Sequence, residues 1–188
     1  LMPRLLASLA EQAPGVRIDV QHLSPRLPAE ALEKGEIDLA LGRFETLPPR
    51  FAGVRWMSET LQLVAHRDHP QLRDGLDLNT FLRLRHLWVH GGQTRGMVEQ
   101  WLGEHGLARE IVYTTPNYLQ AAHIAAGGDL VAVLPTRLAR YFAGLLPLQL
   151  FDLPFVLGPF DLQIVSLDLR RRDQALQWLV EQIRCLGD

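Results

Sequence analysis

The stretch EKGEIDLALG at residues 33–42 constrains the fold of this chain more than any other feature of the sequence. Gly35 follows a helical segment and can adopt the left-handed conformation that ends a helix. Residues 37–41 then predict a short apolar strand, and such a strand is usually buried on both faces, as in a parallel sheet covered by helices. Ligands of open parallel sheets bind outside the carboxyl ends of the strands, so Gly42, Arg43 and Phe44 are candidate binding residues.

Helical periodicity, short apolar runs and glycine or proline breaks predict that helices and strands alternate along the chain. This alternation indicates an α/β fold with parallel sheets. We expect strands at 16–20, 37–41, 86–90, 111–115, 130–134 and 148–151, and helices at 5–13, 29–34, 78–84, 94–105, 118–126, 136–142 and after the arginine run at 170–172.

Two long extended runs, residues 54–66 and 161–169, stand out from this alternation. Both are rich in β-forming residues, and they lie where each half of the chain would connect to the other. We interpret them as paired crossovers between two lobes. One lobe would hold residues 1–66 with 163–188, the other would hold residues 67–162, and a cleft would lie between them.

The composition is that of a globular domain without an excess of either charge. The 188 residues are 47% hydrophobic and carry a formal net charge of −2, so no basic surface favours direct binding of nucleic acid by this segment. A single cysteine, Cys185, excludes an internal disulfide and fits a reducing, cytoplasmic location, with its thiol buried on a helix face. No apolar run reaches the roughly 18 residues of a membrane span, and a start without methionine indicates part of a longer protein.

Four segments together resemble the effector-binding, or regulatory, domain of LysR-type transcriptional regulators. They are LMPRLL with APGV at 13–16, ALEKGEIDLALG at 31–42, LVAHRDHP at 63–70 and GDLVAVLPTRLA at 128–139. Each segment is loose by itself, but their order and spacing are specific, and the resemblance covers nearly the whole chain. It implies an α/β fold of two Rossmann-like lobes joined by two crossover strands, like that of type 2 periplasmic binding proteins.

The resemblance also implies what accompanies this domain. The family carries an N-terminal winged helix-turn-helix, a linker helix and a first strand, which we expect to be absent from this sequence. Operator DNA would then be bound only through that missing N-terminal domain. Family members form a homodimer or homotetramer by packing a helix of one lobe against a helix of the partner's other lobe, and residues 3–13 and 94–105 are candidates for these helices. Burial of the same helices within the chain is the alternative.

The pocket of the resembling family lies between the lobes, and three segments are carried over to it. The loop at 90–94 has an independent argument, because a glycine-rich loop that enters a helix offers unpaired N–H groups to a carboxylate. It matches neither the dinucleotide nor the Walker pattern, so a simple turn is the alternative. The expected effector-binding residues are Gly42, Arg43, Phe44, His90, Gly91, Thr94, Asn117 and Tyr118.

Each of the other candidates also has a purely structural alternative. Asn117 would be an ordinary N-cap and Tyr118 a packed ring. Arg43 could pair with a carboxylate or only mark a surface after a strand, and Phe44 could line the pocket or belong to the core.

The sequence predicts neither a metal nor a catalytic site. His86 and His90 would lie about 13 Å apart on one side of a strand, too far to share a metal, and no cysteine or acidic cluster joins His66 and His69. We expect these histidines to be polar surface residues. The chain contains no Gly-x-Ser-x-Gly elbow, no local Cys–His signature and no close carboxylate pair, so no cofactor and no enzymatic reaction is predicted.

We therefore expect the effector-sensing and oligomerisation domain of a cytoplasmic bacterial LysR-type regulator. It would bind a small metabolite, with a carboxylate as the candidate class, in the interlobe cleft and thereby control transcription. An extracytoplasmic solute-binding protein of a transporter is the alternative with the same fold, and an enzyme built on two such lobes is a third. An upstream helix-turn-helix or an upstream signal peptide would distinguish the first two.

Overall fold

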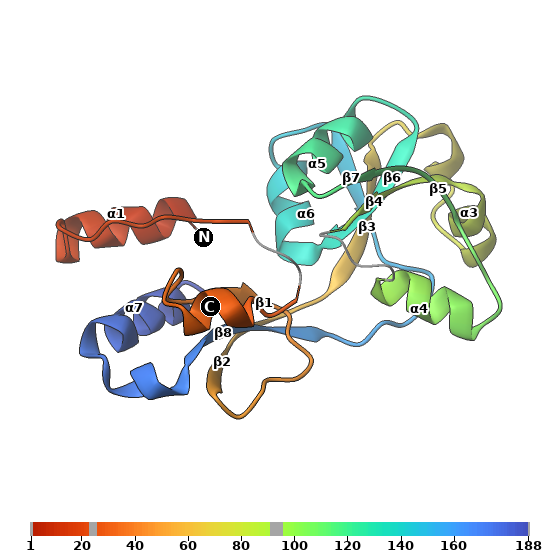
Figure 1. Ribbon diagram of the computed structural model, residues 1–188. Helices are drawn as coiled ribbons and strands as arrows, with labels where there is room; N and C mark the ends of the chain where they lie inside the picture. Colours follow the sequence, from red (N-terminus) through yellow and green to blue (C-terminus); the bar gives the residue numbers. More distant parts are fainter. Residues whose placement is uncertain (1, 23–25, 91–95, 188) are drawn as a thin grey trace. The chain divides into compact units, whose positions relative to one another are not determined.

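The structure, a computed structural model, describes residues 2–22, 26–90 and 96–187 (Figure 1). The chain packs as two compact units. Unit 1 consists of Leu1–Ser58 with Phe160–Asp188, and unit 2 consists of Glu59–Pro159. The sequence-based division assigned residues 59–66 to the first lobe, whereas strand β3 (Leu61–His66) pairs with strands of unit 2 and is part of that unit.

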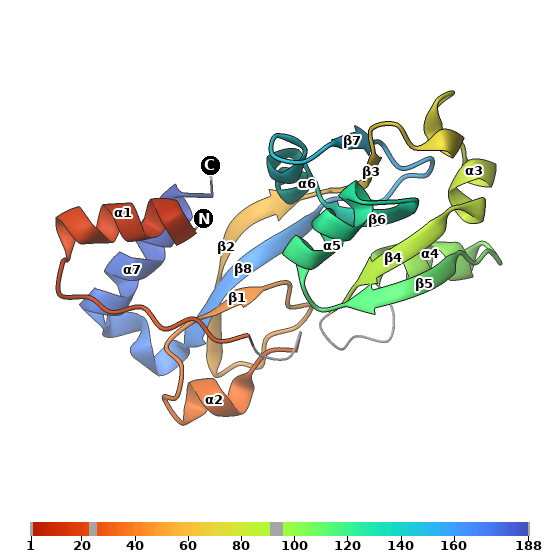
Figure 2. The ribbon, with the colours of Figure 1, turned by 90° about the horizontal axis from the view of Figure 1, so that it is seen from above.

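Unit 1 is built on a sheet whose described strands run in the order β1 (Ala40–Gly42), β8 (Phe160–Leu167) and β2 (Phe51–Glu59). Successive residues of β8 face opposite sides of this sheet, as the pleat of a strand requires. Ile164 packs against α1 (Met2–Gln12) and α7 (Gln174–Cys185), which lie side by side in Figure 2. Val165 packs on the other side, with Leu32 of α2 (Ala29–Glu33) and Phe51.

In the described part of unit 2, five strands form a mixed sheet in the order β5-β4-β6-β3-β7. Strand β4 (Arg85–Val89) runs parallel to β5 (Glu110–Thr115) and to β6 (Leu130–Pro135). Strand β3 runs antiparallel to β6 and to β7 (Leu148–Phe151).

Helices cover both faces of the sheet in unit 2. Leu63 and Ala65 of β3 pack with the residues of α3 (Leu78–Arg83) and α4 (Met97–Glu104). Val64, between them, packs with α5 (Tyr118–Ala126) and α6 (Thr136–Ala143) on the opposite face. All three side chains are fully buried, which explains why the strand is continuously apolar.

The predicted helix stop at Gly35 is confirmed. Gly35 has a φ of +69°, its N–H donates to the carbonyl of Leu32 at 3.3 Å, and the N–H of Glu36 donates to the carbonyl of Ala31 at 2.9 Å. These two bonds form a Schellman motif and satisfy carbonyls that the end of α2 leaves open.

Three predictions about unit 1 were wrong. Residues 16–20 form no strand, and Val16 and Val20 are exposed, because an alternating segment becomes a strand only when a neighbouring strand pairs with it. The strand expected at 37–41 is limited to Ala40–Gly42, and it pairs with β8 in antiparallel rather than parallel orientation. Leu41 is 42% exposed, so this strand is not buried on both faces, and its apolar sequence did not fix the direction of its neighbour. The Cys185 thiol, expected to be buried, is exposed.

None of the helices in the described ranges combines the length and the apolar character that a membrane span requires.

His86 was expected at the surface but is fully buried in unit 2. Arg109 Nη1 lies 3.1 Å from its Nδ1, and because arginine can only donate, Nδ1 accepts and the protonated Nε2 donates to the carbonyl of Phe81 at 2.7 Å. Arg109 also donates from Nε to Glu99 Oε1 at 2.9 Å. Burial, followed by the charge of Arg109, lowers the pKa of His86 from 6.5 to about 4.

This shift predicts a loss of stability in acid. The unfolded chain binds a proton at His86 below pH 6.5, whereas the folded chain binds it only near pH 4. The stabilisation is therefore complete above pH 6.5 and decreases by up to about 3 kcal/mol as the pH falls through this window. We expect urea unfolding curves of the wild type to show this decrease in excess of any decrease in His86→Gln. Equal pH slopes for the two proteins would contradict the assignment.

Candidate functional site

The carboxyl ends of the three parallel strands of unit 2 define one edge of its sheet. Val89 at the end of β4 is opposite Thr115 at the end of β5. Pro135 at the end of β6 is opposite Leu61 at the beginning of the antiparallel strand β3. This edge is where a ligand of such a sheet is expected.

His90 directly follows β4 at this edge. Its backbone N–H donates to the carbonyl of Thr115 at 3.0 Å, and its ring stacks on Trp88 with a centroid distance of 4.7 Å and an interplanar angle of 25°. These two contacts fix the place of His90 at the end of the strand. Gly91 and Thr94, from the same predicted loop, lie outside the described residues.

Asn117 is the N-cap of α5, the structural alternative considered for this residue. Its Oδ1 accepts from the N–H groups of Leu119 at 2.9 Å and Gln120 at 3.1 Å, so only its amide nitrogen is left for a ligand. Tyr118 begins the helix and is 41% exposed, so it is not the packed ring of the alternative. Desolvation of its hydroxyl raises the pKa of Tyr118.

Gly42, Arg43 and Phe44 lie in unit 1, at the end of β1. The Phe44 ring folds back over Gly42, where a Cβ would lie 3.1 Å from its Cζ atom, and Phe44 also packs at the edge of the unit 1 core. Arg43 is half-exposed, with its guanidinium 5.9 Å from the Phe160 ring centroid and 3.4 Å from Glu45.

Gln163 was not predicted and belongs to this part of unit 1. It lies opposite Gly42 in the β1–β8 ladder, and its Nε2 donates to the carbonyl of Phe44 at 3.4 Å. Its Oε1 is buried and has no hydrogen-bond partner among the described residues. No local sequence signal marks Gln163, because the pairing joins residues far apart in the chain.

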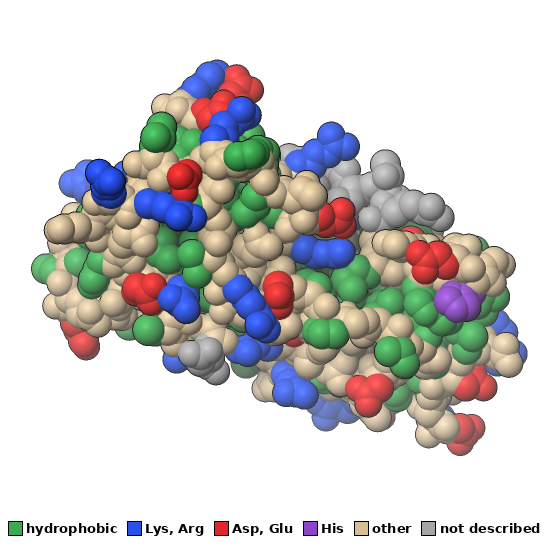
Figure 3. All heavy atoms as spheres, turned by 90° about the horizontal axis from the view of Figure 1, so that it is seen from below, with side chains coloured by type: hydrophobic (Ala, Val, Ile, Leu, Met, Phe, Trp, Pro, Cys, Tyr) green, Lys and Arg blue, Asp and Glu red, His purple; other side chains and the backbone are tan. Residues whose placement is uncertain are grey.

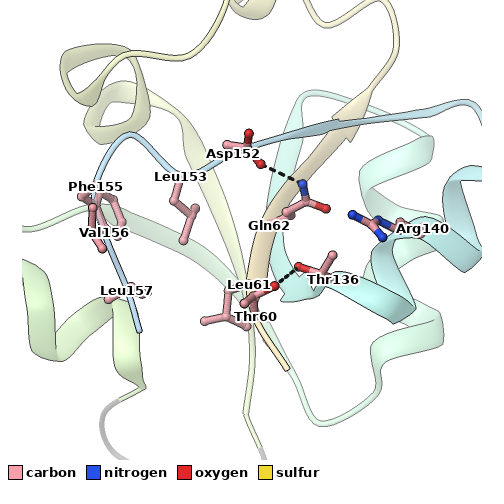
Figure 4. A pocket seen from close by; sticks show the side chains of 10 residues that line it. All are labelled: Thr60, Leu61, Gln62, Thr136, Arg140, Asp152, Leu153, Phe155, Val156 and Leu157. Carbon is pink, nitrogen blue, oxygen red and sulfur yellow. Dashed lines mark hydrogen bonds between the residues drawn. The ribbon is translucent and has the colours of Figure 1, made fainter. Parts of the chain in front are cut away.

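A cavity of about 330 Å³ lies within unit 2, beside the beginning of β3 and the first turns of α6 (Figure 4). One wall is apolar and comes from Leu61 and the segment after β7. The other wall is polar and comes from β3, α6 and Asp152. The lining residues are Thr60, Leu61, Gln62, Thr136, Arg140, Asp152, Leu153, Phe155, Val156 and Leu157.

Two hydrogen-bonded pairs organise the polar wall. The hydroxyls of Thr60 and Thr136 lie 2.8 Å apart, and Gln62 Nε2 donates to Asp152 Oδ1 at 2.8 Å. The sequence analysis missed this cavity. Thr136 directly follows an apolar strand, so the rule that selected Gly42 would have selected it as well.

The histidines and acidic residues that the structure describes form no metal site. His69 was expected at the surface but is buried, with Nε2 3.0 Å from the carbonyl of Asp129. Within residues 2–22, 26–90 and 96–187, no group of three or more histidine, cysteine, aspartate or glutamate side chains is placed to hold a metal ion.

Comparison with known proteins identifies the family. The model of the LysR substrate binding domain matches residues 1–187. The chain belongs to the LysR substrate binding domain family. Nodulation protein D 2 of Sinorhizobium fredii (strain NBRC 101917 / NGR234) is 31% identical over 183 residues, which cover 94% of this chain and 57% of that protein.

Two solved structures of transcriptional regulators share the fold described above. The probable transcriptional regulator PA0477 from Pseudomonas aeruginosa has a TM-score of 0.90 and 33% identity, covering 97% of this chain and 61% of that chain. The regulatory domain of MexT from the same species has a TM-score of 0.85 at 24% identity, covering 98% of this chain and 90% of that chain, and it supports the fold alone.

The family assignment confirms the predicted α/β fold of the type 2 periplasmic-binding-protein class, and the sheets are mixed rather than parallel. It also decides against the solute-binding protein of a transporter, because the LysR substrate binding domain belongs to transcriptional regulators. The chain spans little more than half the length of nodulation protein D 2.

The cap at Asn117 predicts how its structural and ligand-binding roles separate. Asn117→Ala removes the acceptor of two N–H groups and should lower the free energy of unfolding by about 1 kcal/mol. Asn117→Ser keeps an acceptor but removes the amide nitrogen, so its free energy of unfolding should decrease by no more than about half as much as in Asn117→Ala. Chemical denaturation measures both, and equal destabilisation by the two substitutions would contradict the capping role.

Proposed function

We propose that the full-length protein is a LysR-type transcriptional regulator in which this chain senses a small effector. The match of the LysR substrate binding domain across residues 1–187 is the observation that carries the proposal. Operator DNA would be bound through an N-terminal winged helix-turn-helix outside this sequence. The net charge of −2 and the interspersed blue and red side chains on the face in Figure 3 support this division, because a DNA-binding surface is usually basic.

We propose a carboxylate as the class of effector. Arg43 offers a half-exposed guanidinium whose ion pair with Glu45 is long, at 3.4 Å, and an exposed pair of this kind contributes little stability. A carboxylate would gain a charge-assisted bond there at little cost to the fold. The proposed binding residues remain Gly42, Arg43, Phe44, His90, Gly91, Thr94, Asn117 and Tyr118.

The proposed mechanism is a shift between two arrangements of the regulator. An effector that binds one arrangement more tightly increases its population, and the difference in binding free energy is transmitted to the DNA-binding domains. A homodimer or homotetramer is the proposed assembly. Leu6 of α1 is 51% exposed and is an apolar side chain that such a contact would cover.

We further propose that the protein acts in the cytoplasm and is not an enzyme. Two similar proteins, the transcriptional activator NahR of Pseudomonas putida and the transcriptional regulator SyrM 2 of Sinorhizobium fredii, carry names of regulators rather than of enzymes. Operator DNA and its metabolic signals are found in the cytoplasm, so a regulator of this class would have to act there.

Binding of a metabolite panel tests the sensing role. We expect at least one small carboxylate to raise the melting temperature of the chain, because a ligand that binds only the folded state stabilises it. Arg43→Ala should weaken that ligand at least about tenfold, the loss of one charge-assisted bond. Arg17→Ala, a change at another exposed arginine of unit 1, is the control and should leave the affinity unchanged.

The full-length protein gives the complementary measurement in a reporter assay. If a ligand stabilises the chain and changes transcription from the target promoter, it is the effector. If the regulator responds to a metabolite that does not bind this chain, the sensing role proposed for the domain is wrong.

A further inference from the structure

The cavity beside β3 and α6 has the size and the two-sided lining of a small-ligand site. Its volume of about 330 Å³ lies at the lower end of the range for ligand clefts. Leu153, Phe155 and Leu157 form an apolar wall, which would gain from contact with a hydrocarbon group. The opposite wall presents Gln62, Asp152 and Arg140 (Figure 4).

The charged neighbours of Gln62 fix the orientation of its carboxamide. Nε2 donates to Asp152 Oδ1 at 2.8 Å, and in Figure 4 the other end of the amide points toward Arg140. A flipped amide would place the oxygen against a carboxylate and the NH₂ group toward a guanidinium, both unfavourable. Oε1 therefore faces Arg140, and it is buried without a hydrogen-bond partner in the described part of the chain.

Two polar groups of this wall have no partner among the described residues, one of them buried and the other exposed to solvent. The buried Oε1 of Gln62 needs a donor, and leaving it unpaired is unfavourable. The guanidinium of Arg140 lies in the lining of the same cavity, and the contacts found for the described residues include no ion pair or hydrogen bond from it. The cavity therefore offers a cation and an acceptor next to each other, with the Asp152 carboxylate beside the acceptor.

We propose that this cavity binds a free α-amino acid with an apolar side chain. The carboxylate of the ligand would pair with Arg140. Its ammonium group would donate to Gln62 Oε1 and to Asp152, and its side chain would contact Leu153, Phe155 and Leu157. An α-amino acid carries both charges on one carbon, which matches a wall where Gln62 contacts Asp152 on one side and faces Arg140 on the other.

Simpler ligands fit this wall less well. A monocarboxylate would pair with Arg140 but would leave Gln62 Oε1 unpaired and would lie near the negative charge of Asp152. A primary amine would satisfy Oε1 and Asp152 but would leave Arg140 without an anion and repel it. The zwitterion is the class in which every polar group of the wall gains a partner.

This inference goes beyond the proposed regulatory function. The cavity contains none of the eight residues proposed for the effector, and the ligand need not be the effector. A failure to bind amino acids would leave the LysR assignment and the sensing role unaffected.

Calorimetric titration of the 188-residue chain tests the site. The ligands are L-leucine, L-methionine and L-phenylalanine. Two analogues of leucine are compared with them: 4-methylpentanoate, which lacks the ammonium group, and 3-methylbutylamine, which lacks the carboxylate. We expect at least one amino acid to bind, and each leucine analogue to bind at least about tenfold more weakly than leucine, the loss of one charge-assisted interaction. Absence of binding by all three amino acids, or equal affinity of leucine and 4-methylpentanoate, would overturn the proposal.

Two substitutions assign the charges to residues. Arg140→Gln should weaken leucine at least about tenfold but should not weaken 3-methylbutylamine, which the guanidinium repels, whereas Asp152→Asn should weaken both. Arg73→Gln and Asp74→Asn, at exposed positions of the same unit outside the cavity, are the matched controls and should change neither affinity. Because Arg140 and Asp152 are themselves exposed, the variants should fold, which a melting curve verifies. Leucine affinity that is insensitive to both pocket substitutions would refute the assignment.

Discussion

The antiparallel pairing of β3 with β6 is the constraint on which the rest of unit 2 depends. It places the first residue of β3, Leu61, against the last residue of β6, Pro135. The polar residues that flank these two strands, Thr60 and Thr136, therefore meet and form a hydrogen bond at 2.8 Å. A shift of this register by one residue would separate Thr60 from Thr136 and exchange the side chains that β3 presents to the two helical layers, so core packing and pocket geometry are set by the same ladder.

The middle of the unit 2 sheet is buried on both faces and is therefore apolar, so polar contacts for a ligand are available only at its edge. Leu63, Val64 and Ala65 are fully buried, and side chains of this kind offer a ligand no polar contact. Polar side chains appear where β3 begins and β6 ends. Some of them form hydrogen bonds with each other, whereas Gln62 Oε1 has no partner within the described ranges. A buried polar group without a partner in a native structure calls for a physical explanation.

Local hydrogen bonds were predictable from the sequence. Gly35 ends α2 in a left-handed conformation, as its position after a helical segment indicated, and Asn117 caps α5 with its side chain, the structural alternative considered for it. The missed features involve distant partners. The predicted direction of β1 was wrong because its partner strand, β8, comes from the other end of the chain. His86 was wrongly predicted at the surface because its contact with Arg109 joins residues from different parts of the sequence.

The sequence by itself determined the family, the α/β class and the ends of most helices, because these depend on the order of short motifs and on contacts within a few residues. Only the tertiary structure decided which strands are antiparallel and which polar groups of Gln62, Arg140 and Asp152 share one cavity. The three residues come from a strand, a helix and a loop separated by many positions. Their proximity results from the packing of the sheet, which cannot be predicted from any single segment of the chain.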